Sequence, residues 1–194
     1  MRFPQTNKPP LGSLINCAHP LAKGLIGCWL MNEGSGNRIY DSTPNRFDST
    51  AFIGNAAFVR NMIAFDGAGD YVPIPWAKIP LNTGNPTSYS VVIRFSLNSL
   101  AAVNMLIGEV SGVTAGLESQ MAILTTGEVE VRDYTTVLTT TDALLATNIW
   151  YTVVYTQDQV TRNIYVNGAL KVSAAGGNHY SGVFLCWKEK YSRR

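Results

Sequence analysis

The sequence has little of what metal centres, disulfide frameworks and nucleophilic active sites are built from. It contains three cysteines and two histidines, none of them at metal-ligand spacing. An odd number of unclustered cysteines argues against a disulfide framework and against a structural zinc site. Cys28 lies in an apolar run, which is typical of a small buried residue. His19 and His179 are isolated in sequence, so we assign them no role.

Charge is scarce as well. Charged residues make up 14% of the chain, with 15 basic against 13 acidic residues and a net charge of +2. Because no basic block stands out, a nucleic acid is a poor candidate partner. No run of residues is long and apolar enough to span a membrane, and the first residues lack the apolar segment of a secretory signal. We therefore expect a virion or extracellular protein without a recognisable signal peptide, exported by assembly into a particle released by lysis.

What the chain does have is many short alternating or β-branched segments separated by turn residues. With 194 residues, 46% of them hydrophobic, it is long enough to bury one sizeable core. This pattern predicts an all-β protein. Asn167-Gly168 between two such segments is typical of a type I′ hairpin turn. The expected strands cover 24–31, 56–65, 71–74, 89–97, 104–110, 119–124, 128–134, 150–156, 163–166 and 169–172.

Five of these segments follow one another in a recognisable order. GLIGCWLMNEGSG at 24–36 is followed by IAFDGAGDYV at 63–72, YSVVIRF at 89–95, WYTVVY at 150–155 and IYVNG at 164–168. Together they resemble the markers of laminin-G-like domains in the concanavalin A-like lectin/glucanase superfamily. The resemblance implies an antiparallel jelly-roll β-sandwich. The start of the chain is also similar to phage and prophage structural proteins that carry this domain.

The resemblance divides the chain into an extended leader (1–23), a laminin-G-like domain (24–187) and a polar tail (188–194). The end departs from the family pattern, in which a last strand lies beside the first. Either residues 183–187 turn back as a short strand, or the sandwich lacks its closing strand. An open edge beside 24–31 would expose unpaired N–H and C=O groups, so we expect the isolated chain to self-associate.

Two glutamates at alternate positions, Glu128 and Glu130, form the one pattern typical of a catalyst. Glycoside hydrolases use two carboxylates, one of which protonates the leaving sugar oxygen. The same pattern arises when Val129 and Val131 face the core and the glutamates face solvent, compensated by Arg132. The resemblance favours this second interpretation, because the strand is not catalytic in laminin-G-like domains. We therefore expect no enzymatic activity, with a glycoside hydrolase as the less favoured alternative.

Four acidic residues on expected loops suit a calcium ion, which several oxygen ligands coordinate in flexible geometry. They are Asp70, Asp66, Asp41 and Glu33. The resemblance implies one calcium ion, since relatives of this fold often carry one. The alternative is that Asp66 and Asp70 only stabilise a turn, and the sequence leaves both interpretations open.

Aromatic residues on loops are candidates for stacking on a sugar ring. Trp76 and Tyr71 are the tentative ligand-binding residues, whereas Trp29 and Trp150 lie within strong strands and are expected in the core. The sequence as a whole predicts a non-catalytic adhesion module that binds a glycan or a protein surface, as part of a phage or extracellular structural protein. A purely structural virion assembly protein is the alternative.

Overall fold

A computed structural model describes residues 9–10, 12–75, 88–108, 120–133, 136–142, 145–158, 160–176 and 186–187. This part is almost entirely β-structure, and its helical segment is the 3-10 turn η1 (Pro20–Ala22). None of its helices has the length and hydropathy needed to cross a bilayer. The strands are β1 (Ala57–Val59), β2 (Met62–Ala64), β3 (Val72–Pro73), β4 (Tyr89–Ser96), β5 (Asn104–Gly108), β6 (Gln120–Ile123), β7 (Val129–Asp133), β8 (Thr136–Thr139), β9 (Trp150–Gln157), β10 (Thr161–Val166), β11 (Ala169–Ala175) and β12 (Cys186–Trp187).

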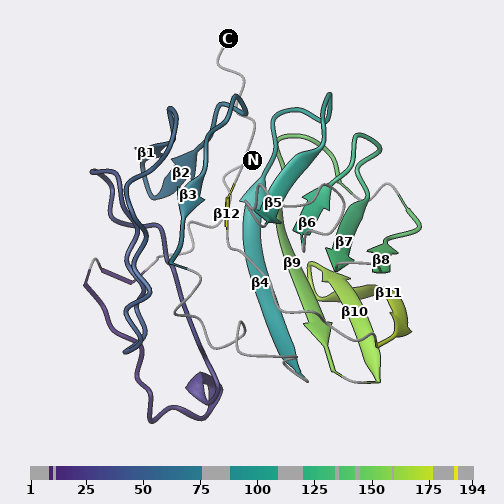
Figure 1. Ribbon diagram of the computed structural model, residues 1–194, viewed down its shortest axis with the longest axis horizontal. Coiled ribbons are helices and arrows are strands. Elements are labelled where there is room, and N and C mark those ends of the chain that lie inside the picture. Colours follow the sequence, from purple (N-terminus) through teal and green to yellow (C-terminus); the bar gives the residue numbers. More distant parts are fainter. Residues whose placement is uncertain are drawn as a thin grey trace.

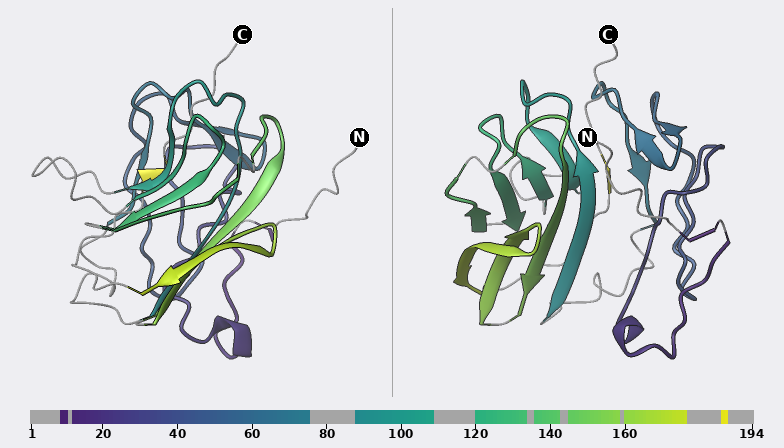
Figure 2. Two further views of the ribbon diagram at one scale, coloured as in Figure 1. Left: turned by 90° about the vertical axis from the view of Figure 1, so that its right-hand side faces the viewer. Right: turned by 180° about the vertical axis from the view of Figure 1, so that it is seen from behind.

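Two four-stranded antiparallel sheets form a sandwich. Their strand orders are β11-β10-β9-β4 and β5-β6-β7-β8, and they pack face to face (Figures 1 and 2). The alternation expected for β4 is confirmed, because Ile93 and Phe95 are buried, whereas Arg94 between them is exposed and Val92 before them is 64% exposed. The expected antiparallel β-sandwich is therefore confirmed. Its core contains Ile93, Phe95, Leu97, Leu106, Ile107, Met121, Ile123, Val129, Val131, Leu138, Leu145, Tyr151, Val153, Tyr155, Ile164 and Val166.

Residues 12–75 form a separate N-terminal layer that lies beside the sandwich, next to β4 and β5 (Figures 1 and 2). It has its own small core of Ile39, Ile63, Phe65 and Val72. Its strands are those of the β1-β2 hairpin and β3, which pairs with β12 from the end of the chain. Most of this layer is extended chain without a sheet ladder, so side chains must satisfy many of its backbone groups.

The expected strand over 24–31 is wrong. Only Trp29 pairs there, through an isolated bridge to Asp41. Gly24 and Met31 at its two ends have positive φ angles of 80° and 55°, outside the strand region. The backbone N–H of Cys28 donates to the Asp41 carboxylate at 2.9 Å rather than to a neighbouring strand. A side-chain acceptor has replaced the sheet partner that the apolar pattern predicted.

Other expectations differ in detail. The segment 56–65 is a hairpin rather than one strand, because the chain turns at Arg60, whose φ is 59°. The sequence did not predict β8. Two of its four residues are threonines, and polar residues typical of a turn follow it at 140–142. The Asn167-Gly168 turn is confirmed, with φ angles of 50° and 84°. Within the segment expected as an extended leader (1–23), Pro9 O accepts from Asn32 Nδ2 and Ile15 N donates to Ser42 O, so both residues contact later parts of the chain.

A last strand is present, but its neighbour differs from the expectation. β12 pairs antiparallel with β3, not with 24–31, and it also lies beside β5. Residues 183–185 lie outside the described part. β12 thus joins the N-terminal layer to the edge of the sheet that begins with β5. The expected self-association of the isolated chain stays a prediction.

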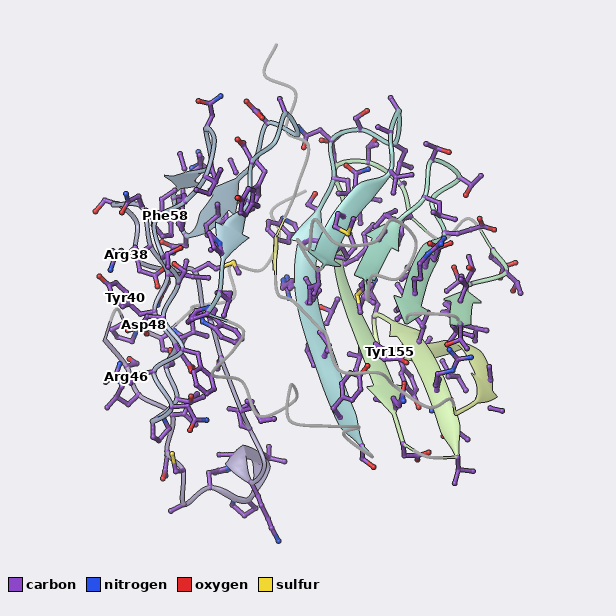
Figure 3. All side chains as sticks on the ribbon, viewed as in Figure 1. Arg38, Tyr40, Arg46, Asp48, Phe58 and Tyr155 are labelled. Atoms are coloured by element: carbon purple, nitrogen blue, oxygen red, sulfur yellow. The ribbon has the colours of Figure 1, made fainter. Side chains whose placement is uncertain are left out.

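A buried tyrosine pair lies between the two sheets of the sandwich. Tyr155 (Figure 3) is 2% exposed, and its hydroxyl donates to Gln157 Oε1 at 2.5 Å. The Tyr89 ring packs edge-on against it, with ring centroids 5.8 Å apart. Burial raises the pKa of Tyr155 to about 12, against a partial opposing effect of the nearby Arg162 guanidinium. Burial also raises the pKa of Tyr89, and the neighbouring Tyr155 adds to that shift.

This pair predicts a loss of stability at alkaline pH. A raised folded-state pKa means that the unfolded chain releases these protons first, so the stabilisation is complete below about pH 10 and falls as pH rises. Between about pH 10 and 12 each tyrosine costs up to about 1.4 kcal/mol per pH unit. Urea unfolding from pH 8 to 11.5 measures the slope. Tyr155→Phe should flatten it, whereas Tyr40→Phe at an exposed ring should not; equal slopes in both variants would contradict the assignment.

Candidate functional site

Asp41, one of the expected calcium ligands, lies fully buried at the centre of the N-terminal layer. Its Oδ1 accepts the backbone N–H groups of Cys28 and Thr43, both at 2.9 Å. Its Oδ2 accepts the Thr43 hydroxyl at 2.7 Å and the Phe47 N–H at 3.1 Å. Burial, with Asp41 nearby, raises the pKa of the Cys28 thiol. The contacts of Asp41 are those of a carboxylate that orders loops.

Asp66 and Asp70 are brought together at the turn after β2. Asp70 is buried and accepts the backbone N–H of Asn55 at 2.5 Å and that of Asp66 at 2.7 Å. Asp66 accepts the Ala68 N–H at 2.7 Å and the Asn55 side chain at 3.0 Å. Gly54 has a φ of 78°, and a Cβ there would lie 2.2 Å from Asp70 Oδ1, so only glycine fits this approach. These contacts are those of the turn-stabilising alternative.

The four acidic residues do not form one ligand set. Glu33 is near Asp41 in the chain fold, since its Oε1 accepts the Tyr40 N–H at 2.9 Å. Among the described residues, no group of three or more His, Cys, Asp or Glu side chains is placed to hold a metal ion. Asp66 and Asp70 alone sit close to each other. The set of predicted calcium ligands is therefore reduced to the carboxylates of Asp66 and Asp70, together with carbonyl groups of nearby loops.

A calcium titration decides between the two roles of this turn. If Asp66 and Asp70 bind calcium, the ion stabilises the native state and raises the melting temperature above that in chelator. Asp66→Asn should then remove the calcium-dependent shift, because the amide is a weaker, neutral ligand. Asp41→Asn is the matched control and should keep the shift even if its own melting temperature is lower. Identical melts of the native chain with millimolar calcium and with chelator would leave Asp66 and Asp70 as turn residues only.

The two candidate catalytic glutamates lie on or beside β7. Val129 and Val131 are buried, as expected, so Glu130 and Arg132 point to the outside of this sheet. Glu130 Oε1 forms a salt bridge with Arg132 at 3.1 Å, which is the charge compensation that the sequence predicted. Glu128 Oε2 accepts the Thr126 hydroxyl at 2.7 Å. The Glu130 side chain was expected to face solvent, but only 12% of it is exposed.

Of the two aromatic residues expected to bind a ligand, the structure describes Tyr71. Tyr71 is half-buried and forms an isolated bridge with Ile53 through backbone hydrogen bonds. Trp76 lies outside the described residues. Trp29 packs against the N-terminal core, and its indole N–H donates to Phe47 O at 2.9 Å, so its expected core position is confirmed.

Trp150 lies on the outside of the sandwich, not in the core. The strand β9 buries Tyr151, Val153 and Tyr155, which places Trp150 on the opposite face. The Arg94 guanidinium lies 5.7 Å above the centre of its ring, a cation–π contact. The alternation of β9 in the sequence contained this information, because Trp150 is in phase with Thr152 and Thr156 rather than with Val153.

An apolar row crosses the outer face of the β11-β10-β9-β4 sheet. It consists of Val92, Val154, Tyr165 and Leu170, which are directly opposite one another from strand to strand. Val92 is 64% and Leu170 54% exposed. Four strands at about 4.8 Å spacing give the row a length of about 14 Å. An exposed row of this kind is a candidate for contact with a ligand.

A polar row runs parallel to it, two residues along β4, β9 and β10 and three residues along β11, where the register with β10 shifts. Its members also oppose one another and carry hydroxyl or amide groups: Ser90, Thr156, Asn163 and Ser173. Asn163 Nδ2 donates to Thr156 Oγ1 at 3.3 Å. The Trp150–Arg94 contact lies on the other side of the apolar row. We refer to the apolar row, the polar row, Trp150 and Arg94 together as the outer face.

Comparisons with known proteins support the fold. No protein-family model and no curated protein matches the sequence. Among solved structures, Trypanosoma rangeli sialidase in complex with 2,3-difluoro-KDN is similar over 91% of this chain and 31% of its own, at 15% identity and a TM-score of 0.61. At this identity the similarity shows a shared fold alone.

Two further solved structures are similar over about half of the chain. A candidate carbohydrate-binding protein of Bacteroides ovatus matches over 50% of this chain and 28% of its own, at 25% identity and a TM-score of 0.39. The CBM40 domain of Ruminococcus gnavus IT-sialidase, bound to α2,3-sialyllactose, matches over 51% and 63%, at 17% identity and a TM-score of 0.43. TM-scores this low do not establish a common fold. The chain spans less than two thirds of the length of each of these three proteins.

Proposed function

We propose that this chain is a non-catalytic glycan-binding module and that the outer face is its binding surface. The observation that carries the proposal is the pairing of a partly exposed apolar row with a polar row on the outer face of one sheet. Sugars also have an apolar and a polar surface. Their C–H faces stack on aromatic and aliphatic side chains, and their hydroxyl groups need hydrogen-bond donors and acceptors. Tyr165 and Trp150 supply the aromatic surface, and Asn163 and Thr156 supply amide and hydroxyl groups.

A protein partner is the competing occupant of the outer face. A stable protein interface buries about 800 Å² on each partner and has an apolar centre several residues wide. The apolar row is one residue wide on each strand, and Ser90 and Ser173 stand at the two ends of the polar row beside it. A narrow row with hydrogen-bonding groups alongside suits an oligosaccharide better than a protein surface.

Loss of the aromatic surface should weaken glycan binding. Trp150→Ala and Tyr165→Ala should each reduce affinity about three- to tenfold, since an aromatic contact contributes about 0.5–1.5 kcal/mol. A glycan array that includes sialylated and neutral glycans identifies a ligand, and affinity electrophoresis measures the change. Leu21→Ala, at a side chain that is 88% exposed in η1, is the matched control.

Two results would count against this proposal. One is an array on which the native chain binds no glycan. The other is a bound glycan whose affinity is unchanged in the Trp150→Ala/Tyr165→Ala double variant while circular dichroism shows that the variant is folded. Cross-linking of the outer face to a copurifying protein would instead favour the protein partner.

The chain should not hydrolyse the glycans that it binds. Glu130 contacts Arg132 and Glu128 contacts Thr126, and these contacts support a structural role for both glutamates. We expect reducing-sugar release from β-glucan, starch and xylan to stay at the level of buffer alone over a day. Turnover that disappears in Glu128→Gln or Glu130→Gln would make the chain a glycoside hydrolase.

We propose further that the module belongs to a phage or extracellular structural protein, as the leader sequence suggests. In that setting glycan binding would attach the particle or protein to a surface. A purely structural assembly role is the alternative, and it predicts no ligand on the array. Flanking capsid or tail genes would establish the phage setting.

A further inference from the structure

A second cluster of exposed polar and aromatic side chains lies on the N-terminal layer. Two extended segments run antiparallel there, joined by hydrogen bonds from Ser49 N to Ile39 O and from Phe52 N to Asn37 O. Because alternate residues face opposite ways, Ile39 and Ser49 are buried and their neighbours point outward. Figure 3 shows Arg38, Tyr40, Asp48 and Arg46 along the side of this layer that faces away from the sandwich. We call these four residues the Tyr40 cluster.

The cluster combines one aromatic ring with fixed hydrogen-bonding groups of both kinds. The Tyr40 side chain is 50% exposed. The Asp48 carboxylate is held in place because its Oδ1 accepts the Asp41 N–H at 2.9 Å. Asp41 is itself fixed by its four hydrogen bonds, so the position of Asp48 is set by the most ordered part of the layer. Arg38 and Arg46 are exposed, and among the described residues neither is within ion-pair distance of a carboxylate.

We propose that the Tyr40 cluster is a second carbohydrate site, specific for an uncharged sugar ring. Tyr40 would stack on the C–H face of the ring, Asp48 Oδ2 would accept a hydroxyl, and the guanidinium groups of Arg38 and Arg46 would donate to ring or hydroxyl oxygens. Arg46 Nη1 donates to Asp41 O at 3.5 Å, so its remaining N–H groups would contact the sugar, whereas no hydrogen bond to a described residue engages the Arg38 guanidinium or Asp48 Oδ2. The site goes beyond the outer face, although it rests on the same proposal that the chain binds glycans.

The charges of the cluster decide between neutral and acidic sugars. Two guanidinium groups stand against three carboxylates, because the Glu33 carboxylate accepts the Tyr40 N–H and the buried Asp41 follows Tyr40 in the chain, in addition to Asp48. Their combined field gives no net attraction for an anion. A nucleic acid is disfavoured for the same reason, since Asp48 would face its phosphates. An uncharged ring can use the donors and the acceptor together.

The two proposed sites lie on different parts of the molecule, so they can be measured separately. In ¹⁵N–¹H spectra of the full chain, maltotetraose, cellotetraose, mannotetraose and xylotetraose are titrated one by one, with trigalacturonate as the acidic probe and oligo(dT) as the nucleic acid probe. We expect a neutral tetrasaccharide to shift the amides of residues 38–48. Tyr40→Ala should weaken that response about three- to tenfold, and Tyr40→Phe should retain it, because stacking needs the ring and not the hydroxyl.

Matched variants make the result specific. Asp48→Asn keeps an oxygen for the Asp41 N–H but has no anionic acceptor, and Arg38→Gln removes one donor; both should weaken binding at the cluster. Arg60→Gln changes an exposed arginine in the β1-β2 turn and should have no effect. Trp150→Ala should leave the shifts at residues 38–48 unchanged.

The outcomes separate this inference from the proposed function. Shifts at 38–48 that Tyr40→Ala removes support the second site, whether or not the outer face also responds. Shifts confined to β4, β9 and β10 would overturn the second site and leave the proposed function intact. Responses at 38–48 to trigalacturonate or oligo(dT) alone would overturn the assignment to an uncharged sugar. No response to any probe would overturn the second site.

Discussion

The burial of alternate residues between two antiparallel sheets is the constraint on which the rest of this protein depends. Ile93, Phe95, Val153 and Tyr155 occupy the core. Because successive side chains of a strand point to opposite faces of the sheet, the residues that alternate with them face outward. Val92 and Val154 must face outward even though they are apolar. A slip of one residue would bury Arg94 and expose Phe95, which fixes the register firmly. The outer face is therefore a direct consequence of how the core is filled.

The N-terminal layer is held together in a different way. Its core is small, and few of its backbone groups find a sheet partner. Buried carboxylates replace the missing ladder: Asp41 and Asp70 each accept hydrogen bonds from segments distant in sequence. A buried polar group is costly unless it is hydrogen-bonded, so these aspartates tie loop geometry to one arrangement. The same network extends through Asp48 to the Tyr40 cluster, because the Asp41 N–H fixes one oxygen of the Asp48 carboxylate.

The two parts of the molecule thus offer two surfaces with different chemistry. The outer face is a four-stranded surface with apolar and polar rows. The Tyr40 cluster is a compact group with one ring, one carboxylate and two guanidinium groups. If both bind carbohydrate, one chain contacts a polysaccharide at two points, and the effective concentration of the second contact raises the overall affinity. Weak individual sites would then suffice for attachment.

The sequence by itself determined the all-β class and most of the strands, because period-two alternation in segments such as 89–97 is a local property, and the family resemblance added the antiparallel sandwich. It also determined the Asn167-Gly168 turn and the inward valines of β7. The outward position of Trp150 was contained in the alternation of β9, but the prediction that placed this residue in the core was wrong. It could not decide that 24–31 would lack a strand, or that β12 would pair with β3. Those outcomes depend on acceptors and partners far away in the chain, such as Asp41 for Cys28 at a separation of 13 residues. The roles of Asp41, Asp48 and Asp70 likewise emerged only from the tertiary structure, since a carboxylate in a loop sequence carries no mark of which distant N–H groups it will meet.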